Sequence, residues 1–381
     1  MDFSFTEEQT LLRDTVAAYL ADNYDFDKRR AAVASPAGWR PEVWKALAEE
    51  LGILGASFSE EQGGLGGGAT EVMVVAEELG KALVVEPYLG TVVIGGGFLK
   101  RAGGPLADEL IGRIISGEAR FAFAWAEPQA RYCLNDIALE AKKDGAGWTL
   151  NGAKAVVVGA PFATHLIVTA RTGGARRDAG GVSVFVVERG AKGVNARDYP
   201  TVDGNRASEI EFENVSVGPE ALLGTAGEGL PMIEAVVDEA IAATCAEACG
   251  VLRKLHEGTL EYTRQRKQFG APIASFQVLQ HRMVDMFMAF EQAVSMTYMA
   301  HIKLAEPVAE RAKAVSAAKV QIGRACRFVG QNAIQLHGGM GMTDEMAIGH
   351  YFKRATMIEG QFGSVDHHLA RYEALAFAKA A

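Results

Sequence analysis

The feature that most constrains the fold of this chain is a change in hydrophobic period that occurs twice. Residues 1 to about 120 place apolar side chains at helical spacing. From about 121 to 228 the chain holds short β-prone runs separated by turn residues such as Asp144-Gly145 and Asn151-Gly152. From about 229 onward the helical spacing returns. We therefore predict an N-terminal α domain (1–120), a middle β domain (121–228) and a C-terminal helical domain (229–381).

Local signals place individual elements within these regions. Thr6 and Gln9 have the spacing of a capping box, so a helix is expected to begin after Thr6. Further helices are expected near 39–51, 71–79, 275–304 and 308–336, and another one begins near Pro231. The middle region predicts an antiparallel barrel or sandwich whose strands cover 121–126, 137–142, 148–150, 155–158, 165–170, 182–187 and 210–212.

The composition excludes several classes of protein. The chain has 381 residues, of which 22% are charged and 49% hydrophobic, which is typical of a soluble globular protein. Its formal net charge of −9 argues against broad binding to nucleic acid. No apolar run approaches the roughly 20 residues that cross a bilayer, so membrane insertion is not expected. The opening Met1-Asp2-Phe3 lacks the basic region of a secretory signal.

The four cysteines favour a reducing, cytoplasmic location, because they are few and scattered. Cys245 and Cys249 lie four residues apart on a predicted helix and therefore share a face. No cluster of Cys or His lies near them in sequence, so they are interpreted as buried small residues, and no metal site is predicted.

Two motifs in the last third of the chain carry chemistry. The first is Arg266-Lys-Gln-Phe-Gly270, continued by Gln277, and the second is Gln335-Leu-His-Gly-Gly-Met-Gly341. Together with the order of the three domains and the acidic, glycine-rich stretch 59–66, these motifs closely resemble the acyl-CoA dehydrogenase family. The resemblance covers essentially the whole chain and implies that family's fold, with a middle β-barrel and a C-terminal four-helix bundle.

The resemblance also implies FAD as the cofactor, an acyl-CoA as the substrate and an electron-transfer flavoprotein as the electron acceptor. Arginine suits a pyrophosphate, since its planar fork can bind two oxygens, and missing side chains let peptide N–H groups approach a ligand. The residues assigned to FAD are Arg266, Gln268, Phe269, Gln277, Gln335, His337, Gly338 and Gly339. In similar enzymes these elements of one subunit reach the FAD held mainly by its neighbour.

Each assignment has a simpler alternative. Arg266 could be a solvated charge, Phe269 a core residue and Gly338 the C-cap of a helix. His337 lies inside the glycine signature, so packing or a ribose contact is favoured over a role as general base.

The chain departs from the family where the reaction needs a base. Removal of the α-proton of the thioester is normally assigned to a glutamate. The alignment places Phe362 at the usual position and Ala240 at the alternative one on the first C-terminal helix. Glu239 would serve only if the alignment were shifted by one residue, and Glu359 and Asp366 are interpreted as solvated charges, so the catalytic residue is unknown.

The β domain departs as well. Relatives hold the flavin ring with a Thr-Glu-Pro stretch and a later Trp-Ile-Thr-Asn stretch. Here Glu127 and Pro128 are kept, but Val158 stands where a hydroxyl would face the flavin, and valine has no hydrogen-bond donor.

These losses fall on the half of the site that holds the ring and moves the proton, whereas the elements that reach a neighbour's FAD are intact. The pattern favours one subunit of an α2β2 enzyme whose larger acyl-CoA dehydrogenase partner supplies the base. The chain resembles the small subunits of two-chain enzymes of the pimeloyl-CoA dehydrogenase type, with cues at Met1-Asp2-Phe3, 126–132, 349–354 and 366–371. The alternatives are a self-sufficient homotetramer with a relocated base, Glu239 or Asp366, and a flavin-free structural subunit. β-Oxidation of lipids is the implied process, and the acyl group is open.

Overall fold

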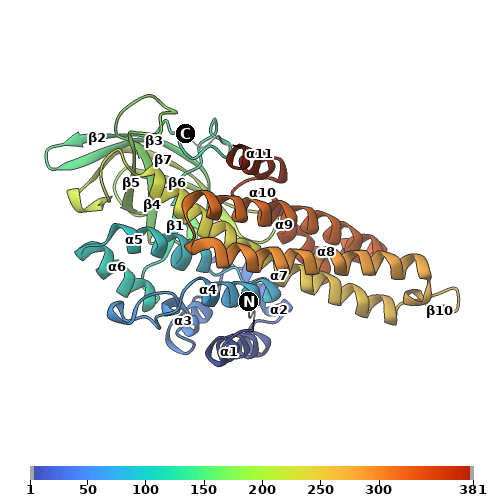
Figure 1. Ribbon diagram of the computed structural model, residues 1–381. Coiled ribbons are helices and arrows are strands. Elements are labelled where there is room, and N and C mark those ends of the chain that lie inside the picture. Colours follow the sequence, from blue (N-terminus) through green and yellow to red (C-terminus); the bar gives the residue numbers. More distant parts are fainter. Residues whose placement is uncertain (1–3, 378–381) are drawn as a thin grey trace. The chain divides into compact units, whose positions relative to one another are not determined.

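The computed structural model describes residues 4–377 and divides into two compact units, each assembled from separate stretches of the chain (Figure 1). One unit contains Met1–Ala34, Ala69–Val84 and Ile241–Ala381, and the other contains Ser35–Gly68 and Val85–Ala240. The opening residues Met1-Asp2-Phe3, which contributed to the predicted resemblance, lie outside the described part.

The first unit is helical. The predicted capping box is present, because the Thr6 hydroxyl accepts from the Gln9 N–H at 3.2 Å and the Gln9 side chain accepts from the Thr6 N–H at 3.1 Å. The elements of this unit are α1 (Glu7–Asn23), α2 (Phe26–Ala34), α4 (Ala69–Ala82), most of α7 (Leu230–Gln265), the hairpin β9 (Lys267–Gln268) and β10 (Ala271–Pro272), α8 (Gln277–Ile302), α9 (Val308–His337), α10 (Ala347–Gly360) and α11 (Val365–Ala376).

Helices α4 and α7 approach each other with their backbones nearly in contact. A Cβ on Gly80 would lie 2.2 Å from the Glu247 carbonyl oxygen, and one on Gly250 would lie 2.1 Å from the Glu77 carbonyl oxygen. Only glycine allows so close a crossing. The Arg253 guanidinium reinforces it by pairing with the Glu77 carboxylate at 3.2 Å.

The second unit combines helices with the β domain. The helices are α3 (Pro41–Glu49), α5 (Gly96–Ala102) and α6 (Pro105–Ile115), with a π-helix over Leu89–Gly95. The strands are β1 (Phe121–Ala124), β2 (Glu140–Asp144), β3 (Gly147–Val158), β4 (His165–Arg171), β5 (Val182–Glu188), β6 (Val194–Pro200), β7 (Arg206–Val217) and β8 (Leu222–Leu223).

The strand order is β6-β7-β3-β2-β4-β5-β8, and β1 pairs with β4. The sheet is mixed, which differs from the antiparallel prediction, because β1 and β2 each pair with β4 in parallel. The two runs predicted at 148–150 and 155–158 form one strand, β3, with irregular register on both sides of its middle. Strand β6 was not predicted, since it is an edge strand whose residues are mostly exposed and show no apolar alternation.

The sheet encloses an apolar core that includes Leu150, Val168, Phe185 and Phe212. Among the described residues, no helix is long and apolar enough to cross a membrane. Cys245 and Cys249 are buried at 0% and 2% exposure, which confirms their interpretation as small packing residues.

We expect Gly250→Ala to lower the free energy of unfolding by about 1–3 kcal/mol, because the new methyl group would overlap the backbone of α4. The matched control is Gly112→Ala, a helix-interior glycine in α6 whose added Cβ would meet nothing within 4 Å. This control should instead stabilise by about 0.5–1 kcal/mol. Chemical denaturation of both variants decides the point, and equal midpoints would contradict the close crossing.

Candidate functional site

The first motif forms a short exposed hairpin beyond the end of α7. Its two central residues, Phe269 and Gly270, have φ angles of +54° and +81°, as a type I′ turn requires. A left-handed conformation is costly for an aromatic residue. The Phe269 ring is nevertheless 94% exposed and lies edge-on to the Phe276 ring, with ring centroids 6.2 Å apart. The prediction that Phe269 could be a core residue is therefore wrong, and its ring is displayed at the tip of the hairpin.

The second motif lies at the C-terminal end of α9. Gly338 is the C-cap, with φ +59°, so the alternative interpretation of this glycine is correct for the backbone. A Cβ on either Gly338 or Gly339 would meet no described atom within 4 Å. Internal packing therefore does not explain the second glycine, although the Gly338 N–H is itself engaged, because it donates to the Gln335 carbonyl.

His337 and Tyr262 bring the two motifs together. Their rings stack with centroids 4.3 Å apart, and the Tyr262 hydroxyl donates to the His337 carbonyl at 3.3 Å. Arg266 lies one helical turn beyond Tyr262, and Gly338 directly follows His337. Burial lowers the pKa of His337, and its Nδ1 contacts the Ala333 carbonyl at 2.8 Å. His337 is thus a neutral packing residue, whereas the remaining predicted FAD contacts are exposed: Arg266, Gln268, Gln277 and Gln335.

Phe362, at the predicted base position, lies in a loop that a buried lysine holds in place. The Lys319 ammonium is 1% exposed and donates to the carbonyls of Ile358 and Glu359 at 2.9 Å and of Gly363 at 2.8 Å. It therefore binds the C-terminal carbonyls of α10 and the loop that follows, where a cation also complements the helix dipole. Burial lowers the pKa of Lys319, and its three donors are matched by three acceptors.

A buried histidine completes this loop. His368 Nε2 lies 3.2 Å from the Phe362 carbonyl oxygen, so the proton is on Nε2, and Nδ1 faces the Ser316 hydroxyl at 3.4 Å. Phe362 itself has φ +57°. A Cβ on Gly363 would lie 2.6 Å from His368 Nε2, so the next position requires glycine. Lys319 and His368 therefore fix the backbone of this loop, yet the residue at its apex, Phe362, is apolar.

The other predicted positions hold a buried alanine, two paired carboxylates and one exposed carboxylate. Ala240 is fully buried, and Glu239 forms a two-pronged pair with Arg101 at 2.6 and 3.1 Å. Glu359 pairs with Arg327 at 3.2 Å, and Asp366 is exposed in the first turn of α11.

The loop of Phe362 and the glycine motif contact different parts of helix α9. Lys319 binds the loop, and His337, within the glycine motif, lies 18 residues later on the same helix. At 1.5 Å per residue these positions are roughly 27 Å apart. A ligand that touches the glycine motif of this chain therefore lies well away from this chain's own Phe362 loop.

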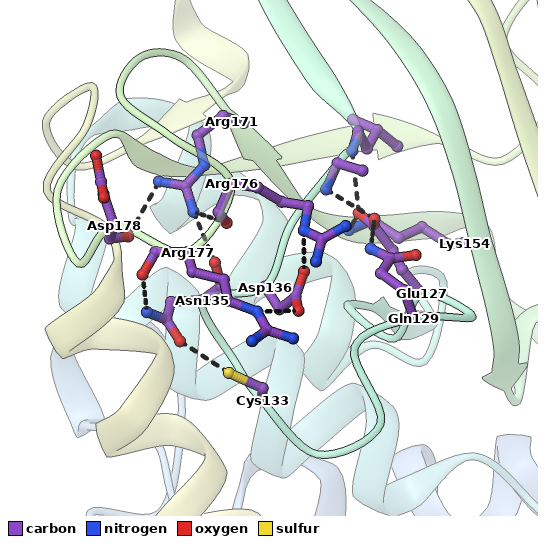
Figure 2. Close-up of polar contacts among 12 residues, drawn as sticks. Glu127, Gln129, Cys133, Asn135, Asp136, Lys154, Arg171, Arg176, Arg177 and Asp178 are labelled. Carbon is purple, nitrogen blue, oxygen red and sulfur yellow. Dashed lines mark hydrogen bonds and ion pairs between the residues drawn. The ribbon is translucent and has the colours of Figure 1, made fainter.

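In the β domain, the Glu127 carboxylate is engaged in contacts within the protein (Figure 2). Its carboxylate accepts from the N–H groups of Ala138 at 2.7 Å and Leu139 at 3.1 Å, and it pairs with Lys154 at 2.8 Å. Lys154 also donates to the Thr169 hydroxyl, and its burial lowers the pKa of the ammonium to about 8. The pair joins β3 to the segment after Pro128 and presents no group to a ligand.

The outer face of β3 is apolar where a flavin contact was predicted. Val156 and Val158 are 51% and 41% exposed, and Val156 has φ +51°, which is a rare conformation for a β-branched residue. Val156 is therefore both strained and exposed, but neither Val156 nor Val158 can donate a hydrogen bond.

Sequence reasoning missed Lys319, His368 and Lys154. The signal for Lys319 was present, because it follows Val315 and Ala318 and precedes Ile322 on the apolar face of a predicted helix, where a lysine needs a partner. The partners themselves are main-chain carbonyls and left no mark in the sequence. Among the described residues, no group of three or more His, Cys, Asp or Glu side chains could hold a metal ion.

The chain thus combines a mixed β sheet with long helices whose ends carry an arginine motif and a glycine motif. The chain matches three family models: "Acyl-CoA dehydrogenase, N-terminal domain" over residues 6–118, "middle domain" over 122–215 and "C-terminal domain" over 227–372. The chain belongs to the acyl-CoA dehydrogenase family, whose members are oxidoreductases that act on CH–CH bonds.

Individual relatives agree along the full length. The chain is 30% identical to acyl-CoA dehydrogenase IpdE2 of Mycolicibacterium smegmatis, covering 98% of this chain and 100% of the relative. It is 29% identical to the probable acyl-CoA dehydrogenase YngJ of Bacillus subtilis, covering 94% and 95%. The crystal structure of the ChsE4–ChsE5 complex from Mycobacterium tuberculosis matches with a TM-score of 0.89 at 26% identity, covering 99% of both chains.

We expect Lys319→Met to lower the free energy of unfolding by about 3 kcal/mol, because three buried carbonyls lose their donor. The control is Lys313→Met on the same helix, which removes only a surface pair with Glu310 and should change stability by less than about 1 kcal/mol. Hydrogen exchange should accelerate in residues 360–364 of the first variant alone. Equal exchange in both variants would contradict the role of Lys319 as a clamp.

Acid should destabilise the fold through His368, since burial lowers its pKa from 6.5 to about 3. The unfolded chain then takes up the proton first, so stability falls as the pH drops from 6.5 toward 3, by up to about 1.4 kcal/mol per pH unit. His368→Gln should flatten this part of the pH dependence of unfolding, whereas the exposed His281→Gln should not. A slope unchanged by His368→Gln would show that this imidazole does not stay neutral.

Proposed function

We propose that this chain takes part in FAD-dependent α,β-dehydrogenation of an acyl-CoA thioester as one subunit of a two-chain enzyme, in which a larger acyl-CoA dehydrogenase subunit supplies the catalytic base. The observation that carries the proposal is the loop of Phe362. Lys319 and His368 hold its backbone in one conformation, but no carboxylate stands at its apex or at Ala240.

The residues of this chain fit one end of FAD and not the other. Arg266, Gln268 and Phe269 are exposed beside Gly338 and Gly339, where an added Cβ would occupy open space. Such a surface suits a pyrophosphate and an adenine, which need a cation, N–H donors and a flat apolar partner.

The flavin ring has no comparable support. Val158 offers no donor, and the Glu127 carboxylate is paired with Lys154. When bound, the flavin supplies the acceptor for the hydrogen that leaves the acyl β-carbon as hydride. We infer that this chain completes an FAD site whose ring is held by another chain, with Gln277 and Gln335 contributing to the nucleotide end and His337 packing beneath it.

The separation along α9 supports sharing between chains. Along α9, Lys319, which holds the Phe362 loop, and His337 of the FAD motif lie roughly 27 Å apart, which favours a base for this motif's FAD that comes from another chain. Complexes of two different named chains occur among the structures similar to this one, as in ChsE4–ChsE5. We therefore favour an α2β2 tetramer of the type formed by pimeloyl-CoA dehydrogenase, in the cytoplasm, with an electron-transfer flavoprotein as acceptor.

We also propose that the domain boundaries of the chain lie near residues 120 and 228.

Expression alone and together with the neighbouring dehydrogenase gene tests the proposal. We expect little flavin and little acyl-CoA-driven dye reduction from the isolated chain. The co-expressed enzyme should carry a single FAD for each pair of unlike chains and should be active. Ordinary turnover by the isolated chain would reject the two-chain proposal, and a relocated base such as Glu239 or Asp366 would then be required.

The same complex gives a second measurement. Arg266→Met should weaken FAD retention by roughly 1.5–3 kcal/mol, because it removes a charge-assisted contact to phosphate. The matched control is Arg264→Met, which removes an exposed charge two residues earlier in the last turn of α7. Equal retention in both variants would remove Arg266 from the FAD site, and a complex that assembles and turns over without flavin would favour a structural subunit.

A further inference from the structure

A single histidine in the first turn of α10 joins the turn after the glycine motif to helix α2. His350 Nε2 lies 3.1 Å from the Asp344 carbonyl oxygen and 3.1 Å from the Asp344 carboxylate. Its Nδ1 lies 3.3 Å from the Arg29 guanidinium. A guanidinium only donates, so Nδ1 must accept, and the proton of the neutral ring is therefore on Nε2. These contacts require an uncharged imidazole.

Arg29 is a fixed donor because it is itself held in place. It is 2% exposed, and its Nε donates to the Leu83 carbonyl at 2.9 Å, just beyond the end of α4. The Phe26 ring packs edge-on against the imidazole, with ring centroids 4.9 Å apart. The His350 side chain is only 13% exposed. The imidazole therefore sets the position of Asp344 relative to α2.

The turn that contains Asp344 is continuous with the glycine motif. Gly341 is buried, and a Cβ on Gly349 would lie 3.2 Å from the Gly341 carbonyl oxygen, so the start of α10 packs directly on the motif. The Thr343 N–H donates to the Met340 carbonyl at 3.2 Å. A residue that holds this turn thus also holds residues 338–346, and a segment that is held before binding loses less conformational entropy when a ligand binds.

The charged groups around His350 favour the neutral ring. Burial is the largest influence and lowers the pKa of His350, and Arg29 and Lys353 lower it further. The hydrogen bond to the Asp344 carbonyl and the Asp344 carboxylate both act in the opposite direction. That carboxylate is 64% exposed and is shared with Arg30 at 3.5 Å and Lys353 at 4.0 Å, so solvent and two other cations weaken its effect on the imidazole.

We propose that His350 is a positioning residue for the glycine motif, whose neutral imidazole holds the Asp344 turn against Arg29 and whose protonation releases that turn. The identity of the positioned ligand as FAD rests on the proposed function, whereas the release rests on the geometry at His350. A proton on Nδ1 would face the guanidinium donor to donor, so this contact is lost.

The sign of the pH dependence follows from the neutral ring. The released segment takes up its proton near the ordinary histidine pKa of 6.5, before the held segment does. The ratio of held to released segment therefore falls by up to about tenfold for each pH unit below 6.5, until the held form is protonated as well.

Hydrogen exchange in the full chain, without any ligand, tests the release. Protection factors of residues 338–346 should fall several-fold from about pH 7.5 to about pH 5.5 in the unmodified chain. His350→Gln should lose much less, because an amide does not titrate and can still accept from Arg29 and donate to Asp344. The matched control is Lys353→Met, which removes a cation beside the same carboxylate and should keep the acid response.

Two results of this experiment would overturn the proposal. One is an equal acid response in the unmodified chain and in His350→Gln. The other is an acid response that disappears in Asp344→Asn, which keeps the carbonyl, but persists in His350→Gln, since the titrating group would then be the carboxylate. If His350→Gln does not fold, the unmodified chain still decides, because protection of 338–346 that does not fall in acid also rejects the release.

The affinity of the co-expressed complex for FAD separates this inference from the proposed function. The dissociation constant of FAD should rise several-fold more between these two pH values in the unmodified complex than in the complex with His350→Gln. Equal rises would overturn the positioning role and leave the two-chain proposal standing. If exchange depends on His350 but the complex does not bind FAD at any pH, the release stands and the proposed function fails.

Discussion

The interaction on which the C-terminal part of the helical unit depends is a set of three hydrogen bonds. The buried Lys319 ammonium donates them to main-chain carbonyls. A charge enters the interior of a helical bundle only if each of its protons finds an acceptor, and here the acceptors are the end of α10 and the loop after it. That requirement fixes the backbone around Phe362, and His368 fixes it a second time. The loop therefore keeps its conformation whichever side chain stands at its apex.

Because backbone and side chain are independent here, the fold places little demand on the identity of the residue at the apex of this loop. Replacing a carboxylate by phenylalanine at the apex removes none of the contacts of Lys319, because those contacts involve only main-chain oxygens. Helix α9 carries this loop near one end and the glycine motif at the other. One rigid helix thus supports two features that need not serve the same active site.

The β domain shows the same separation between scaffold and surface. Glu127 and Lys154 are buried against each other and tie the strands together, and a lone buried charge at either position would cost several kcal/mol, so both are retained. Val156 and Val158 on the outer face carry no such constraint. The loop of Arg176 and Arg177 is built in the same way, since the buried Arg171 donates to its carbonyls while the Arg176 and Arg177 side chains remain exposed.

The sequence by itself determined the order of helical, β and helical regions, the capping box at Thr6 and the two motifs, because periodicity and residue identity are local properties. It could not reveal the edge strand β6, whose exposed residues lack an apolar rhythm, or the parallel pairing of β1 with β4. Only the tertiary structure decided that Phe269 is displayed, that Tyr262 joins the two motifs, and that Lys319 and His368 fix a loop. These contacts join residues far apart in the chain, several through main-chain atoms that every residue type shares, so no pattern of side chains records them.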